Sequence, residues 1–518
     1  MGSRFQRILP YFAVRSNTRM AATKNDIPFP NPNRWWWLAL AALAAVRLYR
    51  LPEVALPDYD SVRNWQIVQE VAYGNLRHLF HHGSPGFSLV YAPVAWLTSD
   101  FRVFQHLNAL LAVAALGRLT RFVGHQLRLS GREVALLTLF AGTSIFLTFS
   151  GRDFTMSAGS LWCFAGLLEA YYRRLQAPSR ATLLRATFWL VAGLCFNYKF
   201  ILTLPILAVL EMWQADGLLW KRGNLVRVVG LFLTPYLVLG AVGVAVGLPW
   251  YLWPAIYYKL AFPDAANAAG RTGTVVFDGL YYLRFLWQFE SPLLWIGAGL
   301  GLWQLRRTQW PSRGQLLPLP WYLVVWAGCL LAGMSLLLKA PRGLLWAYPL
   351  LYVLAFLSLR QRVPRGVLFG VIVTGITWNG YRLQQEVFAY APTRYPQVAA
   401  WVRAHGGGKV ASTVGLGLGP FRSANDTVLA ITNTQQLTGL RQRGYRYVLL
   451  DDYYRVAGVL HFDSLRRKPA IAAWPEPLLT SPLLFLEHSE YTGLGYEETL
   501  ARQRMAAQDT LQLRLLKL

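Results

Sequence analysis

The sequence predicts an all-helical protein that crosses a membrane many times and ends in a small α/β domain. Two observations predict the membrane part. The chain is 54% hydrophobic with a mean hydropathy of +0.29, and uncharged runs near the ~20 residues that a helix needs to cross a bilayer recur along it. A third observation predicts the domain, because the composition becomes mixed polar and apolar from residue 382 onward. We therefore expect a basic tail over 1–34, a membrane domain over 35–381 and an extracytoplasmic domain over 382–518.

The high net positive charge would also suit a nucleic-acid partner, but the distribution of the basic residues along the chain argues against one. The net charge is +26, from 51 basic and 25 acidic side chains. The arginines gather in short loops between apolar runs, which is the positive-inside pattern of membrane proteins. Most of them are therefore interpreted as a topology signal without a ligand. The cysteines Cys163, Cys195 and Cys329 lie inside apolar runs and form neither a disulfide framework nor a zinc pattern.

The first span sets the orientation of the chain. The basic tail precedes the apolar run 35–49, and no signal-peptide cleavage pattern separates them, so we expect this run to stay as an anchor with a cytoplasmic N-terminus. The span then delivers Asp58 and Asp60 to the outer side of the plasma membrane, which we take to be a bacterial inner membrane. Two carboxylates just outside a span are costly near lipid unless they have a function.

Further apolar runs give the remaining spans. We expect about 11 spans in total, over 35–49, 103–122, 133–150, 154–172, 182–197, 199–215, 228–248, 281–305, 319–338, 343–359 and 364–380. The run 85–97 is short for a crossing. If it crossed fully, every later basic loop would fall outside, so the charge bias favours a re-entrant or surface segment and an outer C-terminal part.

On this topology the outer side receives five pieces of chain, and each has a charged residue where the chain turns. They are the loop 50–102, the turn Gly151-Arg152-Asp153, the hairpin Asn197-Tyr198-Lys199, the loop 249–280 and the segment Lys339-Ala340-Pro341-Arg342. The inner loops contain scattered arginines instead. We therefore expect any active site on the outer side.

The C-terminal part has the pattern of a small α/β domain. A helix is expected over 395–405, closed by three glycines, and another over 434–443. Short strands are expected over 409–414, 427–431 and 445–450. Strand, helix and strand in alternation predict an α/β fold.

The outer charges suggest a chemistry. An exposed carboxylate at a membrane surface can deprotonate an acceptor hydroxyl or amine as it attacks an activated sugar carbon, and Asp60 and Asp58 offer this group. Basic side chains can neutralise a lipid phosphate leaving group, and these are Lys199, Arg342, Arg152 and Lys339. The histidines His81 and His82 can bind phosphate or assist proton transfer.

In the order of these elements, residues 40–380 resemble the integral-membrane glycosyltransferases of the C-type (GT-C) fold. Within this group the sequence resembles the family 39-like relatives, the protein O-mannosyltransferases and aminoarabinose transferases. The resemblance rests on the acidic first outer loop, the turn His82-Gly83-Ser84-Pro85, the turn Ser150-Gly151-Arg152-Asp153, the lysine hairpin at Lys199 and the Lys-x-Pro-Arg segment at Lys339. Ser61 stands where relatives often have glutamate, and the histidine turn is not His-Pro-Pro.

The resemblance implies an enzyme that transfers a sugar from a polyprenyl-phosphate donor. Asp60 matches the catalytic aspartate by position, with Asp58 second. Lys199 and Arg342, with Arg152 or His82, would hold the donor phosphate. The implied partners are this donor, membrane lipid and a glycan, lipid or protein acceptor.

Other interpretations stay open at this point. Asp60 could N-cap the following helix, Asp58 could be a supporting residue, and Asp153 could pair with Arg152. Lys199 and Arg342 could reach toward lipid headgroups. The sequence identifies no cofactor with certainty, and the paired carboxylates could hold a divalent metal, Mg²⁺ or Mn²⁺. The competing functions are a transporter or lipid-handling protein and an inactive scaffold that binds cell-envelope partners.

Overall fold

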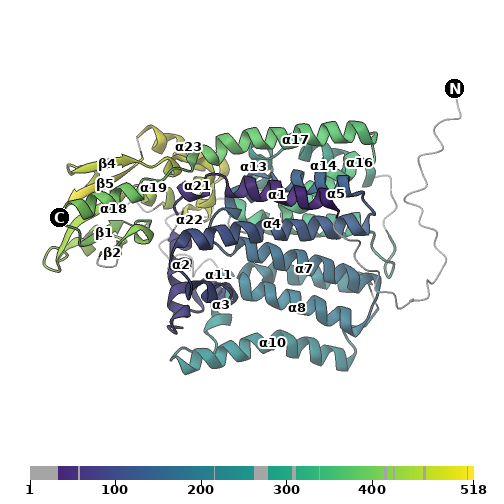
Figure 1. Cartoon of the computed structure of the whole chain (residues 1–518). Helices are drawn as coiled ribbons and strands as arrows, with labels where there is room; N and C mark the ends of the chain where they lie inside the picture. Colours follow the sequence, from purple (N-terminus) through teal and green to yellow (C-terminus); the bar gives the residue numbers. More distant parts are fainter. Residues whose placement is uncertain are drawn as a thin grey trace.

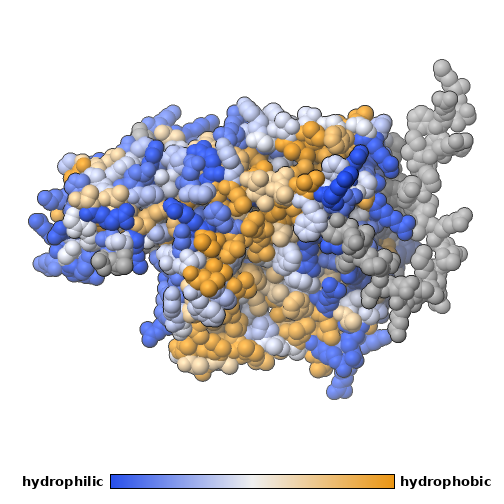
Figure 2. Space-filling view, viewed as in Figure 1, coloured by the Kyte–Doolittle hydropathy of each residue, from blue (hydrophilic) through white to orange (hydrophobic). Residues whose placement is uncertain are grey.

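The computed structural model places a bundle of helices next to a smaller α/β region (Figure 1). It describes residues 33–56, 59–214, 216–261, 278–305, 311–337, 339–413, 417–423, 426–458, 462–509 and 511–518. Hydrophobic residues gather over the helical bundle, whereas hydrophilic residues dominate the far part of the α/β region (Figure 2). This distribution fits a bundle surrounded by lipid and a region that lies in water.

The bundle contains the helices that the apolar runs predict. Their bounds are α1 (Arg34–Leu48), α4 (Phe101–Gln126), α5 (Gly131–Gly142), α6 (Ile145–Gly151), α7 (Ser157–Gln176), α8 (Arg180–Phe196), α9 (Thr203–Gln214), α10 (Arg222–Ala245), α13 (Tyr281–Phe289), α14 (Pro292–Leu305), α15 (Leu319–Ser335), α16 (Ala347–Arg360) and α17 (Arg365–Glu386). Helices α1, α4, α7, α8 and α10 pack next to one another in this order (Figure 1). Capping boxes fix two starts, Ser130 with Glu133 for α5 and Ser179 with Thr182 for α8.

Few of these helices are both long and apolar enough to cross a bilayer by themselves. Among the described residues, α4 and α10 are long and apolar enough, and the α5–α6 pair, bent by 72°, would make a third span. Helices α15 and α16 are apolar but have 17 and 14 residues, fewer than the ~20 that a straight crossing needs. The number of about 11 spans therefore stays a prediction.

Two of the expected continuous helices are broken, and one buried carboxylate lies at both breaks. The expected run 133–150 forms α5 and α6, and the run 281–305 forms α13 and α14. Glu290, between α13 and α14, accepts hydrogen bonds from the N–H groups of Ile145 (3.2 Å) and Phe146 (3.0 Å) and from the Ser144 hydroxyl (3.1 Å). A carboxylate satisfies the free N–H groups at a helix start, so Glu290 fixes the beginning of α6 in the bundle.

The first outer loop folds into short helices at the end of the bundle that faces the α/β region. They are α2 (Tyr59–Ala72), the 3-10 turn η2 (His81–Gly83) and α3 (Pro85–Ala95), and α11 (Leu252–Ala261) lies at the same end (Figure 1). Helix α3 has 11 residues and is therefore about 16 Å long. This is too short to cross the ~30 Å hydrocarbon layer, which agrees with the expectation that 85–97 does not span.

The α/β region is built on a five-stranded sheet with the order β2-β1-β3-β5-β4. The strands are β1 (Lys409–Thr413), β2 (Thr427–Ile431), β3 (Tyr445–Asp451), β4 (Ala472–Pro475) and β5 (Gln512–Lys517). Strands β1, β2 and β3 are parallel and agree with the expected strands, whereas β4 and β5 pair antiparallel and were not anticipated.

The helices of the α/β region agree only in part with the sequence analysis. Helix α18 (Tyr395–Ala404) matches the expected helix. The helix expected over 434–443 is wrong, because only the single turn η7 (Thr434–Leu437) forms before Gly439 and Gly444 take positive φ angles of 78° and 82°. The C-terminal helices are α21 (Pro482–Glu487), α22 (Ser489–Thr492) and α23 (Tyr496–Gln508).

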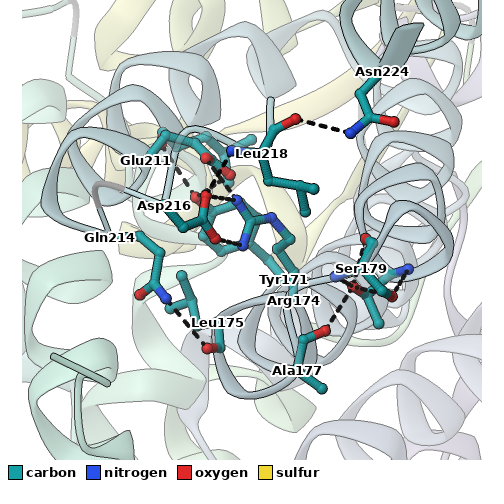
Figure 3. A network of polar contacts seen from close by, with 12 residues as sticks. Tyr171, Arg174, Leu175, Ala177, Ser179, Glu211, Gln214, Asp216, Leu218 and Asn224 are labelled. Carbon is teal, nitrogen blue, oxygen red and sulfur yellow. Dashed lines mark hydrogen bonds and ion pairs between the residues drawn. The ribbon is translucent and has the colours of Figure 1, made fainter. Parts of the chain in front are cut away.

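Several arginines that were interpreted as a topology signal form ion pairs. Near the end of α7, the buried Arg174 contacts Asp216 through two hydrogen bonds (2.6 and 2.9 Å) and Glu211 through one (3.0 Å) (Figure 3). Tyr171 donates to the other oxygen of Glu211 at 3.0 Å. Since Glu211 lies on α9, this network joins α7 to α9. The positive residues of these loops therefore also hold helices together.

Candidate active site

The candidate active site lies where two turns of the bundle and the start of α2 meet α21 and α22 of the α/β region. The two turns are η3 (Tyr198–Leu202) and η4 (Pro341–Leu344). They bring Lys199 and Arg342 next to the same acidic residue, Glu490 of α22.

Arg342 is held by the acidic segment of the α/β region. Its Nε lies 3.2 Å from Glu487 Oε2, and its Nη2 lies 3.1 Å from Glu490 Oε1. Its backbone N–H donates to Glu487 Oε1 (2.9 Å), and Nη2 also donates to the Glu487 carbonyl (3.1 Å). The next residue, Gly343, has no space for a side chain, since a Cβ would come within 2.5 Å of the Tyr282 hydroxyl. The close packing of η4 therefore depends on glycine at this position.

Lys199 reaches the same carboxylate from the other side. The Asn197 side chain accepts the Lys199 backbone N–H at 2.9 Å and so begins the turn η3. The Lys199 Nζ then lies 3.7 Å from Glu490 Oε2. One carboxylate thus contacts both cations, with one oxygen directed to each.

Asp60 joins this group through Tyr491. The Tyr491 hydroxyl donates to Asp60 Oδ2 at 3.2 Å, and the Arg342 guanidinium lies 5.5 Å from the centre of the Tyr491 ring. Asp60 is the second residue of α2, so the residue before the helix is Asp58 and not Asp60. The N-cap interpretation of Asp60 is therefore not supported, while its negative charge in the first turn still favours the helix. Asp58 lies outside the described residues.

Burial in this junction changes the pKa of two neighbours. Burial raises the pKa of Glu487 to about 7, although Arg342 opposes the change by favouring the carboxylate. Burial, helped by the Arg342 charge, lowers the pKa of His488 to about 3. His488 is therefore neutral near pH 7, and its Nε2 lies 2.9 Å from the Tyr453 hydroxyl.

Arg152 and Asp153 have a different environment. Arg152 Nη1 donates to the carbonyls of Arg47 (3.0 Å) and Tyr49 at the end of α1, and the guanidinium lies 4.9 Å from the Phe388 ring centre. Asp153 accepts the N–H of the next residue at 2.7 Å. In the described part of the chain, the recorded contacts of Arg152 are with the end of α1 and the Phe388 turn and not with Glu490. Its position indicates a role in holding α1.

The remaining predicted residues border the site. The turn that contains His81 packs on the lysine hairpin, because a Cβ on Gly83 would lie 3.5 Å from the Tyr198 Cβ. The His82 side chain lies outside the described part. Lys339 is buried and its Nζ donates to the Leu337 carbonyl at 3.2 Å. Its own carbonyl accepts the Ser489 hydroxyl at 2.6 Å, which ties the segment before η4 to α22.

The sequence analysis missed the residues that complete the site. They are the polar residues of one short stretch, Glu487, His488, Ser489, Glu490 and Tyr491. A signal existed, because two acids and a histidine follow directly on the apolar stretch 482–486. This stretch lies beyond the last expected span, in the α/β region, where no site residue was predicted.

The metal prediction is not tested by these contacts. Among the described residues, no three His, Cys, Asp or Glu side chains gather in an arrangement that could hold a metal ion. Of the paired carboxylates, only Asp60 is described, and it accepts a hydrogen bond from a phenol next to a guanidinium.

Comparisons with known proteins give fold similarity without sequence similarity. No protein-family model and no curated protein matches the sequence. Among solved structures, an oligosaccharyltransferase from Archaeoglobus fulgidus, tethered to an acceptor peptide, has a TM-score of 0.50 at 11% identity, over 81% of this chain and 69% of that chain. ArnT from Cupriavidus metallidurans gives 0.47 in the apo state (18% identity, 71% and 70% coverage) and 0.48 bound to undecaprenyl phosphate (16%, 90% and 76%).

At these identities the likeness concerns the fold alone. The oligosaccharyltransferase has the C-type glycosyltransferase fold. The chain therefore has the fold that its motifs resemble, the C-type fold of integral-membrane glycosyltransferases.

Proposed function

We propose that the protein transfers a sugar from a polyprenyl-phosphate donor to a cell-envelope acceptor at the outer face of the plasma membrane. The observation that carries this proposal is the meeting of Lys199 and Arg342, 143 positions apart in the sequence, around one carboxylate and next to Asp60. The donor sugar is proposed to be a hexose.

The two cations have a spacing that suits a phosphate. Lys199 and Arg342 contact the two oxygens of the Glu490 carboxylate at 3.7 and 3.1 Å. A phosphate also presents several oxygens on one centre, and charge-assisted hydrogen bonds from arginine and lysine are the usual way to hold it. The same pair can therefore contact one donor phosphate.

An apolar pocket that is lined in part by the turn of Lys199 supports a lipid donor. It has a volume of about 160 Å³. Its lining residues come from α15 and from the start of α9 with the preceding turn, and are Leu202, Pro205, Ile206, Val209, Cys329, Leu330, Gly333 and Met334. Leu202 belongs to the turn that also contains Lys199, and α15 ends at Ser335, before Arg342 in the sequence. A short apolar segment of a polyprenyl chain in this pocket would contact the turn that contains Lys199.

The proposed reaction needs one base and one stabilised leaving group. Asp60 takes the proton of the acceptor hydroxyl or amine while that atom forms a bond to the anomeric carbon. The bond from this carbon to the phosphate oxygen breaks, and its electron pair leaves with the polyprenyl phosphate, whose charge Lys199 and Arg342 stabilise. A single displacement of this kind inverts the anomeric centre. Mg²⁺ or Mn²⁺ at Asp58 and Asp60 remains part of the proposal, and chelation followed by re-addition of each ion tests it.

The experiment is transfer from radiolabelled polyprenyl-phosphate sugars in membranes that contain the full chain. We compare the wild type with Asp60→Asn, Asp58→Asn and Asp153→Asn at equal expression. The proposal expects activity in the wild type, a collapse in Asp60→Asn and retention in Asp153→Asn. Full activity in Asp60→Asn would move the base to another aspartate. Binding of polyprenyl phosphate without transfer from any sugar would favour an inactive scaffold.

A further inference from the structure

Helix α22 of the α/β region contacts all three residues on which the proposed function depends. Glu490 bridges Arg342 (3.1 Å) and Lys199 (3.7 Å). The neighbouring Tyr491 donates to Asp60 at 3.2 Å. This helix has four residues and comes from a part of the chain far from all three. It lies in the place where a donor phosphate and the acceptor group would have to bind.

The summed charge of the site disfavours the binding of a phosphate while Glu490 is present. Lys199 and Arg342 contribute two positive charges, and Asp60 and Glu490 two negative ones. Glu487, whose pKa burial raises to about 7, adds partial negative charge near neutral pH. The described groups therefore sum to neutral or slightly negative. An arriving phosphate would add further negative charge in contact with a carboxylate, which is strongly unfavourable in a partly buried site.

The two glutamates that contact Arg342 are held differently. Glu487 is tied to the backbone of η4, since its side chain accepts the Arg342 N–H (2.9 Å) and its carbonyl accepts Arg342 Nη2 (3.1 Å). Glu490 contacts the two cations through its side chain, from a one-turn helix that ends at Gly493. Gly493 has a φ of 71°, a conformation that glycine adopts without strain. A phosphate could therefore replace Glu490 as the partner of the two cations, while Glu487 keeps Arg342 in place.

We propose that Glu490 is an internal occupant of the donor-phosphate site. In the arrangement described here, the α/β region closes the site with Glu490 on Lys199 and Arg342, and the donor binds when α22 withdraws. Withdrawal also releases Asp60 from Tyr491, so the base becomes available at the step in which the donor arrives. The inference rests on the proposed function, because it takes these two cations as the phosphate site.

The test is the affinity of the full chain, in lipid nanodiscs, for undecaprenyl phosphate. Glu490→Gln keeps the shape of the side chain and removes the competing charge. We expect it to bind this probe about tenfold more tightly than the wild type, the equivalent of one charge-assisted hydrogen bond that no longer has to be broken. Glu497→Gln, an exposed acid on α23, is the matched control and should leave the affinity unchanged.

A second readout separates competition from misfolding. Glu490→Gln removes a bridge between the bundle and the α/β region, so its thermal stability should fall while its affinity rises. In the wild type, undecaprenyl phosphate should accelerate amide hydrogen exchange over 487–493, because α22 leaves the site. Slower or unchanged exchange in this segment would contradict the inference even if the variant failed to fold.

The outcomes distinguish this inference from the proposed function. If the wild type binds the probe and Glu490→Gln binds it equally or more weakly, Glu490 does not compete with phosphate, and only the further inference is overturned. If neither protein binds the probe, the proposed phosphate site is wrong and the inference fails with it.

Discussion

Arg174 offers the most quantitative test of the structure, because its neighbour in sequence serves as an internal control. Arg174 is fully buried and forms two hydrogen bonds with Asp216 and one with Glu211. Substitution by methionine keeps an apolar stem of similar length and removes the guanidinium. The two carboxylates, whose side chains are only 20% and 12% exposed, then lose their shared cation.

The expected magnitude follows from this burial. Removal of one partner of a buried ion pair costs about 3–5 kcal/mol of unfolding free energy, because the other charge stays in a poorly solvated site. Asp216 keeps some contact with water, so we expect Arg174→Met to lie at the lower end, near 3 kcal/mol. Arg173 pairs with Glu169 at 2.8 Å and its side chain is 29% exposed. Arg173→Met should therefore cost about 0.3–1 kcal/mol.

The assay is reversible unfolding of the purified protein in mixed detergent micelles, followed by tryptophan fluorescence. The double variant Arg174→Met with Asp216→Asn should recover part of the loss, since one stranded charge is gone. Because Glu211 lies near the C-terminal end of α9, the helix that follows Lys199, undecaprenyl-phosphate affinity should also fall in Arg174→Met. Equal unfolding free energies for the two methionine variants would refute the reasoning.

Three further predictions concern the site and the α/β region. Tyr491→Phe removes a bond that holds α22 against Asp60, so undecaprenyl-phosphate affinity should rise about threefold, less than for Glu490→Gln; a lower affinity would contradict this. Gly343→Ala should lower both stability and probe affinity because η4 has no space for a methyl group, whereas Gly366→Ala, with open space around it, should change neither. Burial raises the pKa of Glu476 from 4.5 to about 8, so the folded state retains a proton that the unfolded chain loses, and stability falls as pH rises through this window. Glu476→Gln should flatten that fall in a pH series of melting curves and be more stable than the wild type at pH 8; a parallel pH dependence would argue against it.

The helical bundle could be predicted from the sequence because hydrophobic runs and loop charges are local properties. Runs of apolar residues form helices in lipid regardless of which neighbour they meet. The breaks at 143–144 and 290–291 could not be predicted in this way. They depend on Glu290 meeting the start of α6, 144 to 146 positions away in the sequence, and hydropathy contains no information about that contact.

The roles of individual charged residues likewise depend on contacts that the sequence does not show. Arg152 and Lys199 were both predicted to lie at outer turns and to contact the donor phosphate, with Lys199 ahead of Arg152. In the structure Arg152 donates to carbonyls at the end of α1, whereas Lys199 lies by Glu490. The difference arises from which side of the turn faces the α/β region, and a single sequence does not contain this.

By itself the sequence determined a membrane-embedded helical protein with acidic and basic residues at the turns between its apolar runs, since hydropathy and charge asymmetry act through local partitioning between lipid and water. It also determined, through the order of its motifs, the C-type fold. Only the tertiary structure decided that Lys199 and Arg342 contact Glu490 and that Asp60 contacts the neighbouring Tyr491. Such contacts form between segments that are far apart in the chain. Their free energy depends on how the two segments pack against each other, and neither segment alone determines it.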